Sequence, residues 1–181
     1  TVKSTLPGCI NAKMTIQDFN KEFNNLIPDG PYETIGGYII KIDKTTGINN
    51  DSWLSNFQTN SSNPKDVSFL YHYPEADDIK PAQKTYIQSF ISTFENALSS
   101  AFFLNSSIGY RQYVDINSFV DYYLLNEATR NVDGYRISTF MYKDRDSDNN
   151  KLVIGPPWDY NLGWGNADYC DGGLTNNYMT N

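Results

Sequence analysis

The sequence predicts one α+β domain, and three observations support this fold class. The chain has 181 residues, of which 39% are hydrophobic and 15% aromatic, and this is enough apolar material for one packed core. Two segments carry apolar residues at helical spacing, and four others are short apolar runs bounded by turn residues. No internal repeat or linker-like stretch divides residues 1–181, so we expect a single domain.

The chain contains expected helices and expected strands. Pro81 begins the longest helix, because its fixed φ suits a first helical turn, and apolar residues then recur at helical spacing. The stretch at 44–65 is rich in Asn, Ser and Thr and predicts a long surface loop. In order, we expect a short helix capped by Thr15, a turn at 28–31, a strand at 36–43, the loop at 44–65, a strand at 67–71, a helix at 81–103, a helix at 118–129 capped by Asn117, and a hairpin of strands at 137–143 and 151–154.

The charge pattern limits the partners of this chain. It has 14 basic and 21 acidic residues and a net charge of −7, which argues against a nucleic-acid-binding surface. A small, locally basic phosphate pocket stays compatible with this composition. No apolar run approaches the roughly 18 residues that span a bilayer, so we expect no transmembrane segment. The abundance of Asn, Ser, Thr and Tyr suits an extracytoplasmic bacterial protein.

The sequence contains few histidine and cysteine residues that could carry chemistry. His72 is the single histidine and lies at the end of an expected strand, so we expect it to have a structural role. Cys9 and Cys170 are far apart in the sequence, which leaves open both a disulfide and two free thiols. The Cys and His spacing of a zinc site is absent.

Asp144, Asp146 and Asp148 imitate the opening of a calcium-binding loop. The EF-hand pattern requires a glycine and a bidentate glutamate at later positions, which hold Asn149 and Gly155 in this chain. We therefore interpret the segment as a solvated hairpin turn. A calcium-stabilised structural domain is the functional interpretation that this pattern leaves open.

Asp133 and Asp159 each lie at a break between regular elements. A hairpin between them would bring both breaks to the same end of a sheet, where two carboxylates can hold a metal ion and a phosphate. The lower lobe of a phosphotransferase has the same arrangement, with one aspartate acting on the acceptor and another binding Mg²⁺. For Asp133, an ordinary turn aspartate is the alternative.

A pattern of Asn, Asp and Trp runs through the second half of the chain. Its core consists of Asn131-Val132-Asp133 and Trp158-Asp159-Tyr160-Asn161, in this order. The segments that share the pattern are 36–43, 126–133, 135–136, 141–144, 155–161 and 165–169. Together they resemble the CotH family of spore-coat-protein-H-like atypical kinases over roughly residues 34–170. The resemblance implies a protein-kinase-like fold, mainly the helical C-lobe, with small β-hairpins that carry the catalytic and metal loops.

The resemblance also implies a function and roles for individual residues. It implies ATP-dependent phosphorylation of protein Ser or Thr with Mg²⁺ or Mn²⁺, in which Asp133 is the catalytic aspartate. By matching position, Asp159 resembles the family's metal ligand, and Asn161 resembles the cofactor-binding residue beside it. Many family members carry Asn five residues past the catalytic aspartate, where this chain has Ser138, a weaker Mg²⁺ ligand.

The family's nucleotide-clamping lobe is expected to extend much further upstream of Gly36 than the thirty-five residues present. The resemblance therefore implies a partial domain, and we expect little or no kinase activity from this chain alone. The second interpretation is a non-catalytic module on the same fold that binds a protein or carbohydrate, with Trp53, Trp158 and Trp164 stacking on sugars. The expected partner is a protein substrate or a surface partner, and the expected location is the surface of a bacterium, as a secreted protein or lipoprotein.

Overall fold

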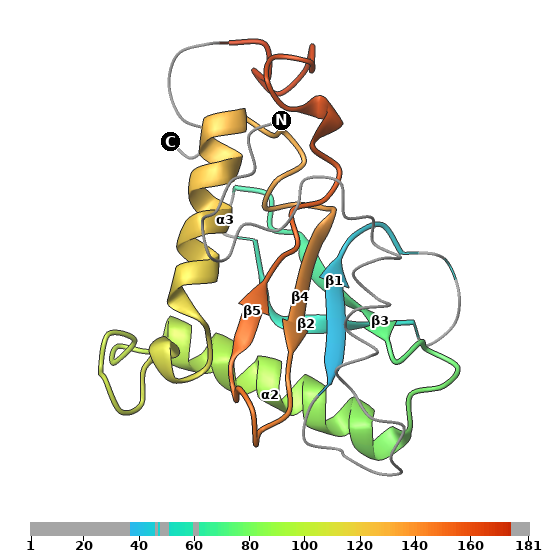
Figure 1. Cartoon of the computed structure of the whole chain (residues 1–181), viewed down its shortest axis with the longest axis vertical. Helices are drawn as coiled ribbons and strands as arrows, with labels where there is room; N and C mark the ends of the chain where they lie inside the picture. Colours follow the sequence, from blue (N-terminus) through green and yellow to red (C-terminus); the bar gives the residue numbers. More distant parts are fainter. Residues whose placement is uncertain (1–36, 46, 48–50, 60–61, 175–181) are drawn as a thin grey trace, which may run out of the picture. The chain divides into compact units, whose positions relative to one another are not determined.

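The computed structural model describes residues 37–45, 47, 51–59 and 62–174, all within the unit Tyr32–Asn181. The predictions about Thr15, the turn at 28–31 and Cys9 lie outside the described residues. The described part is α+β, as the sequence predicts, with a five-stranded antiparallel sheet in the order β2-β3-β1-β4-β5 (Figure 1). The elements are β1 (Tyr38–Ile42), β2 (Ser52–Gln58), β3 (Asp66–Tyr73), α2 (Pro81–Ser99), η1 (Tyr110–Gln112), α3 (Ile116–Thr129), β4 (Thr139–Lys143), β5 (Leu152–Ile154) and η2 (Tyr160–Leu162).

β1 is the central strand and joins two parts of the chain that are distant in sequence. Ile40 of β1 pairs with Tyr71 of β3 on one side and with Met141 of β4 on the other. Side chains alternate between the faces of a strand, so Tyr38 and Ile40 share one face of β1. Both are 1% exposed and belong to the main hydrophobic core.

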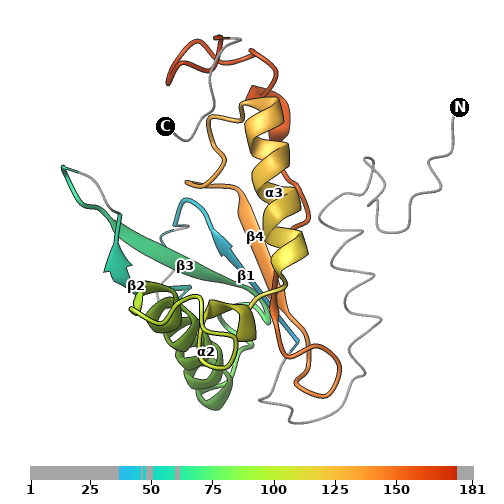
Figure 2. The same ribbon diagram turned by 90° about the vertical axis from the view of Figure 1, so that its left-hand side faces the viewer.

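The helix α2 covers this face of the sheet (Figure 2). Ile87 and Ile91 lie one helical turn apart and are 0% and 1% exposed. Burying a side chain of this size stabilises the fold by about 1.5–3 kcal/mol relative to leaving it in water. The buried members of the core are Tyr38, Ile40, Phe69, Tyr71, Ile79, Ile87, Ile91, Val114, Met141 and Leu152.

The helix α3 lies beside the β4–β5 hairpin and leads into the Asp133 loop (Figure 2). Its N-cap is Asp115, whose Oδ1 accepts a hydrogen bond of 2.9 Å from the backbone N–H of Ser118. The predicted cap at Asn117 is therefore wrong by two residues. Asp115 is fixed by its own N–H, which donates to the Leu152 carbonyl at 2.9 Å. A carboxylate at this position also interacts favourably with the helix dipole.

The surface loop predicted at 44–65 is wrong in part, because β2 lies within it. Trp53 is the physical reason: its ring lies 5.3 Å from the ring of Phe69 and 4.7 Å from that of Tyr71, both on β3. These contacts hold the segment at the edge of the sheet. Of the described helices, none is both long and apolar enough to cross a membrane.

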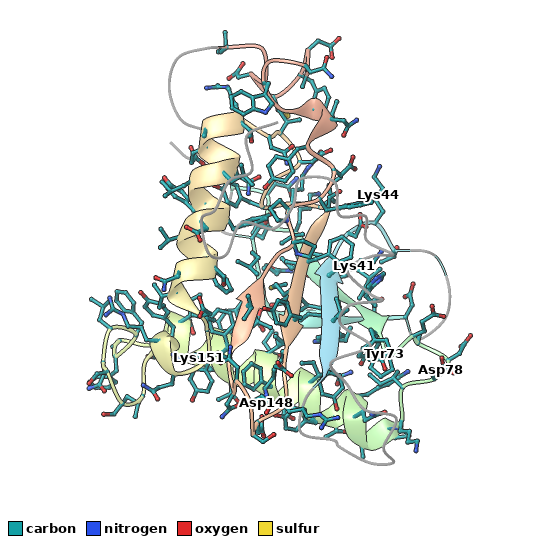
Figure 3. The ribbon with its side chains drawn as sticks, viewed as in Figure 1. Lys41, Lys44, Tyr73, Asp78, Asp148 and Lys151 are labelled. Atoms are coloured by element: carbon teal, nitrogen blue, oxygen red, sulfur yellow. The ribbon has the colours of Figure 1, made fainter. Side chains whose placement is uncertain are left out.

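The two ends of the sheet carry different loops. Ile42 pairs with Thr139, so the end of β1 lies beside the start of β4, directly after the Asp133 loop. Tyr38 pairs with Lys143, so the opposite end of these strands carries the β4–β5 turn. Figure 3 shows Lys41 and Lys44 toward the first end, and Asp148 and Lys151 toward the second.

Candidate active site

Asp133 lies in a tight loop between α3 and β4, and backbone hydrogen bonds close this loop. Its carbonyl accepts from the N–H groups of Arg136 at 3.2 Å and Ile137 at 3.1 Å. Its own N–H donates to Oδ1 of Asn131 at 3.3 Å. Asp133 is 5% exposed. The loop therefore holds this carboxylate in a fixed, nearly buried position.

Asn126 on α3 anchors the same loop. It is 0% exposed, its Nδ2 donates to the Tyr122 carbonyl at 2.9 Å, and its Oδ1 accepts from Asn131 Nδ2 at 3.4 Å. Gly134 packs directly on this side chain, and a Cβ added to Gly134 would lie 2.2 Å from Asn126 Oδ1. This distance is too short for any side chain, so the loop requires glycine after Asp133.

Arg136 pairs with the carboxylate of Asp133. Its Nη2 lies 2.5 Å from Asp133 Oδ1, and the exposed fractions of the two side chains are 59% and 8%. The hydrogen bond to Asp133 raises the pKa of Arg136. The second oxygen, Oδ2, has no hydrogen-bond partner among the described residues, so it is the oxygen of this carboxylate that is available to a ligand.

Ser138 connects this loop to Asp159. Its Oγ donates a long hydrogen bond of 3.4 Å to Asp159 Oδ2. Asp159 follows β5 and is exposed. Because Ser138 ends the loop that Asp133 begins, the bond places the two aspartates in neighbouring loops at one end of the β4–β5 hairpin.

Backbone strain is concentrated around this site. Asp159 is left-handed, with φ 62° and ψ 49°, and Ser138 has φ 54°. Non-glycine residues in this region cost on the order of 1–3 kcal/mol each, and such strain gathers at functional sites. Among the described residues, all non-glycine positions with positive φ lie between residues 130 and 171, the part of the chain that carries both aspartate loops; they are Arg130 (the C-cap of α3), Tyr135, Ser138, Asp159, Trp164, Cys170 and Asp171.

Asn161 lies in η2, one residue beyond Tyr160, and is exposed. Its carbonyl accepts from Asn166 Nδ2 at 2.6 Å, whereas its side-chain amide has no hydrogen-bond partner in the described part of the chain. The segment after η2 is held against α3, because the Trp164 N–H donates to the Thr129 carbonyl at 2.6 Å. The Asn161 amide is therefore available to a ligand beside Asp159.

The donor set of this site suits Mg²⁺. Carboxylate, amide and hydroxyl oxygens come from Asp159, Asn161 and Ser138, and Mg²⁺ prefers such ligands. Among the described residues, no group of three or more His, Cys, Asp or Glu side chains forms a metal cluster. Mg²⁺ does not require one, because it is usually bound by one or two carboxylates together with substrate phosphates and water.

The acidic turn offers much less to a cation. Asp146 Oδ1 accepts hydrogen bonds from Lys143 Nζ and from the Tyr86 hydroxyl, the latter at 2.7 Å. Asp144 Oδ1 accepts from the Arg145 N–H at 2.8 Å. Protein donors thus already use one oxygen on each of two of the three carboxylates, and the calcium interpretation stays a prediction.

The remaining candidates from the sequence have packing contacts or are exposed. His72 packs edge-on against Phe140 at 5.2 Å, and burial lowers its pKa. Trp158 also packs edge-on against Phe140, at 6.4 Å, whereas Trp164 is 75% exposed. Cys170 is exposed. The described residues leave the pairing of the cysteines open, since Cys9 lies outside them.

Comparison with known proteins identifies the family. The family model described as "CotH kinase protein" matches residues 17–181. The chain belongs to the CotH family. The resemblance inferred from the sequence is thereby confirmed, and membership supports a kinase-like domain. Neither the curated proteins nor the solved structures gave a match. The assignment to the helical C-lobe and the roles of Asp133, Asp159 and Asn161 stay predictions.

The structure adds site residues that the sequence analysis missed. Arg136 pairs with Asp133, and the spacing of an aspartate and an arginine three residues apart was the available signal. Asn126 anchors the loop from within α3, and a polar residue on the inward face of a helix was the signal there. Ser138 was noted only as a weak metal ligand, whereas in the structure it joins the two loops.

Proposed function

We propose that this CotH domain is a kinase-like phosphotransferase domain that binds a magnesium–nucleotide complex at Asp159 and Asn161 and orients the acceptor hydroxyl with Asp133. The observation that carries the proposal is the hydrogen bond between Ser138 and Asp159, because it joins the two aspartate loops. Phosphoryl transfer depends mainly on positioning and on neutralisation of charge, and two carboxylates in adjacent strained loops suit both tasks.

Each residue has a distinct part in this proposal. Arg136 holds Oδ1 of Asp133, which orients the carboxylate and leaves Oδ2 to accept the proton of the acceptor hydroxyl. Asp159 and Asn161 supply oxygen ligands on the neighbouring loop. When bound, Mg²⁺ would neutralise charge on the nucleotide phosphates. Ser138 occupies the position of an amide ligand in many family members, so we expect one metal position to dominate.

The test is Mg²⁺-dependent nucleotide binding, which does not require turnover. We expect a fluorescent ATP analogue to bind the chain with Mg²⁺ and to bind at least about tenfold more weakly to Asp159→Asn, since a ligating carboxylate is lost. The matched control is Asp168→Asn, an exposed aspartate of the same segment, which should bind as the unmodified chain does. Asp133→Asn should retain binding, because the proposal gives Asp133 a role in transfer alone.

Two results would contradict this assignment. One is nucleotide binding that is absent or independent of Mg²⁺ in a correctly folded chain, as judged by circular dichroism. The other is an equal loss of affinity in Asp159→Asn and Asp168→Asn, which would indicate a general effect of charge rather than a site.

A non-catalytic module that binds a surface partner is the second candidate function. The observation that favours it is Ser138, because a hydroxyl replaces the expected amide ligand and already donates to Asp159. This function predicts that the Asp133→Ala, Asp159→Ala double variant binds its partner with unchanged affinity. Location at a bacterial surface belongs to this proposal and stays a prediction.

A further inference from the structure

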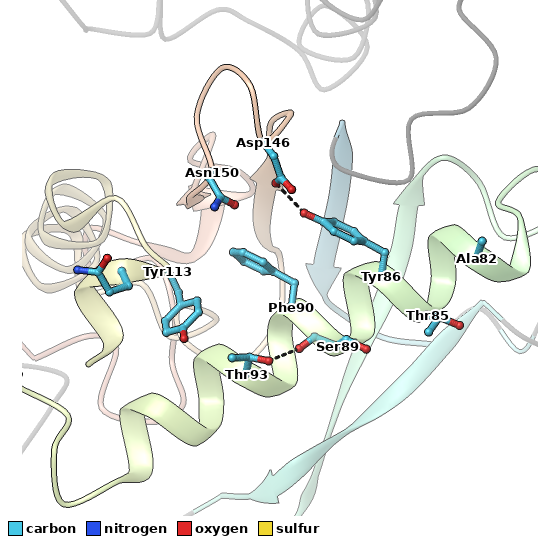
Figure 4. Close-up of a pocket in the computed structure, with 10 residues that line it drawn as sticks. Ala82, Thr85, Tyr86, Ser89, Phe90, Thr93, Tyr113, Asp146 and Asn150 are labelled. Atoms are coloured by element: carbon cyan, nitrogen blue, oxygen red, sulfur yellow. Dashed lines mark hydrogen bonds between the residues drawn. The ribbon is translucent and has the colours of Figure 1, made fainter. Parts of the chain in front are cut away.

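A groove of about 690 Å³ lies outside the candidate active site, where α2, η1 and the β4–β5 turn meet (Figure 4). Tyr86 and Phe90, one turn apart on α2, and Tyr113, which follows η1, supply its aromatic lining. The three rings are partly exposed, and those of Phe90 and Tyr113 meet edge to face at 6.1 Å. Segments distant in sequence therefore form one aromatic-lined depression.

Asp146 presents an oriented carboxylate at this groove. Its Oδ1 accepts hydrogen bonds from both Lys143 Nζ and the Tyr86 hydroxyl. Both donors bind the same oxygen. The other oxygen, Oδ2, has no hydrogen-bond partner among the described residues, and the Asp146 side chain is 35% exposed. Lys143 is 0% exposed and lies 4.9 Å from the centre of the Phe90 ring. The carboxylate is thus held in place by the two donors at Oδ1, whereas Oδ2 is open to a ligand.

The charges around the groove favour a neutral ligand. Lys143 lies directly against Asp146, so the two charges largely cancel for a ligand in the groove. The rest of the polar lining is uncharged and includes Asn150, Ser89 and Thr93. A net charge of −7 also disfavours anions at a distance. Neither a strongly basic nor a phosphorylated ligand finds a matching charge in this lining.

The lining matches the two kinds of surface that a sugar ring presents. The axial C–H groups of a pyranose form an apolar patch that packs on aromatic rings, and its hydroxyls need fixed acceptors and amides. Figure 4 shows Asp146 and Asn150 reaching from the β4–β5 turn toward Tyr86 and Phe90. The Asn150 side chain has no hydrogen-bond partner in the described part of the chain, so its amide is available to a hydroxyl pair.

We propose that this groove is a binding site for a neutral carbohydrate. One sugar ring packs against Phe90 and Tyr113, and its hydroxyls bond to Asp146 Oδ2 and to the Asn150 amide. The site does not depend on the proposed phosphotransfer, because it lies at the opposite end of β4 from the Asp133 loop.

The experiment uses the whole chain and three neutral probes, namely cellohexaose, maltohexaose and the hexamer of N-acetylglucosamine. Saturation-transfer NMR should detect binding of at least one of them, and calorimetry should give its affinity. Asn150→Ala should weaken that affinity about fivefold, as expected for one lost neutral hydrogen bond. Thr93→Trp should abolish binding by filling the groove from an exposed helical position.

Matched controls separate the groove from effects on folding. Asn149→Ala alters the neighbouring residue of the turn, and Asn96→Trp places the same bulk on α2 away from the groove, so both should bind normally. Asp159→Asn should also leave carbohydrate binding unchanged. The proposal is overturned if none of the three oligosaccharides binds, if Thr93→Trp binds normally, or if tri-lysine competes for the groove more strongly than the oligosaccharides do.

Discussion

The contact between Gly134 and Asn126 allows a quantitative test of how the Asp133 loop is held. In Gly134→Ala, the new Cβ would lie 2.2 Å from Oδ1 and 2.7 Å from Cγ of Asn126, whereas ordinary contacts begin near 3.4 Å. Asn126 is fully buried and hydrogen-bonded to Tyr122 and Asn131, so it has no open direction in which to move. Overpacking costs about 1–3 kcal/mol and each lost hydrogen bond about 1 kcal/mol, so we expect about 2–4 kcal/mol of destabilisation.

Urea unfolding followed by tryptophan fluorescence measures this cost, provided that the slope of the transition is unchanged. The matched control is Gly173→Ala, where the nearest atom to the added Cβ is 3.4 Å away and the expected change is within about 0.5 kcal/mol.

Asn126→Ala alone leaves the Asn131 amide unpaired and should cost about 1–3 kcal/mol. In the double variant, the shortened residue 126 makes room for the new methyl group. Its destabilisation should be smaller than the sum of the single changes by about 1–3 kcal/mol. Additivity within about 0.5 kcal/mol would refute the contact and the support it gives to Asp133.

Three further predictions use the same unfolding assay. Asp146→Asn leaves the buried Lys143 ammonium without its carboxylate and should cost about 3–5 kcal/mol, and adding Lys143→Met should recover most of this loss. Burial lowers the pKa of His72 below 6.5, so its contribution to stability is complete above about pH 6.5 and is lost as the pH falls below that value. In His72→Gln, the drop in urea midpoint between about pH 7 and about pH 5 should therefore be smaller, and an equal drop would contradict this assignment. Ile91→Ala should cost about 2–5 kcal/mol through the cavity that it leaves in the core, and a cost below about 1 kcal/mol would contradict its burial.

The parts of the fold that follow from local periodicity were predictable from the sequence. Alternation at Tyr38 and Ile40 marks β1, and the helical spacing of Ile87 and Ile91 marks α2. β2 was not predictable in this way, since its stability depends on Trp53 packing across to β3. The pairing of β1 with β4 is likewise a tertiary contact, and no local pattern in either strand specifies it.

The candidate site was also predictable from the sequence only in part. A hairpin between Asp133 and Asp159 was sufficient to predict that their loops share one end of the sheet. The pairing of Asp133 with Arg136 was not predicted. The spacing of three residues allows the pair, but in a loop the two side chains meet only when the backbone turns back on itself. The left-handed conformation of Ser138 and Asp159 was also hidden, since neither residue type favours it strongly enough to indicate it.

The β4–β5 hairpin connects the two sites and also keeps them apart. β4 runs from Thr139, next to the strained Ser138, to Lys143, which supports Asp146 at the groove. At about 3.3 Å per residue, these ends of the strand lie about 13 Å apart, beyond the reach of any shared side chain. Substitutions at Asn150 or Thr93 should thus leave nucleotide binding unchanged, and substitutions at Asp159 should leave the groove unchanged. The strand is paired on both sides and buried at both ends, so it serves as a rigid base on which each loop can change without altering the other.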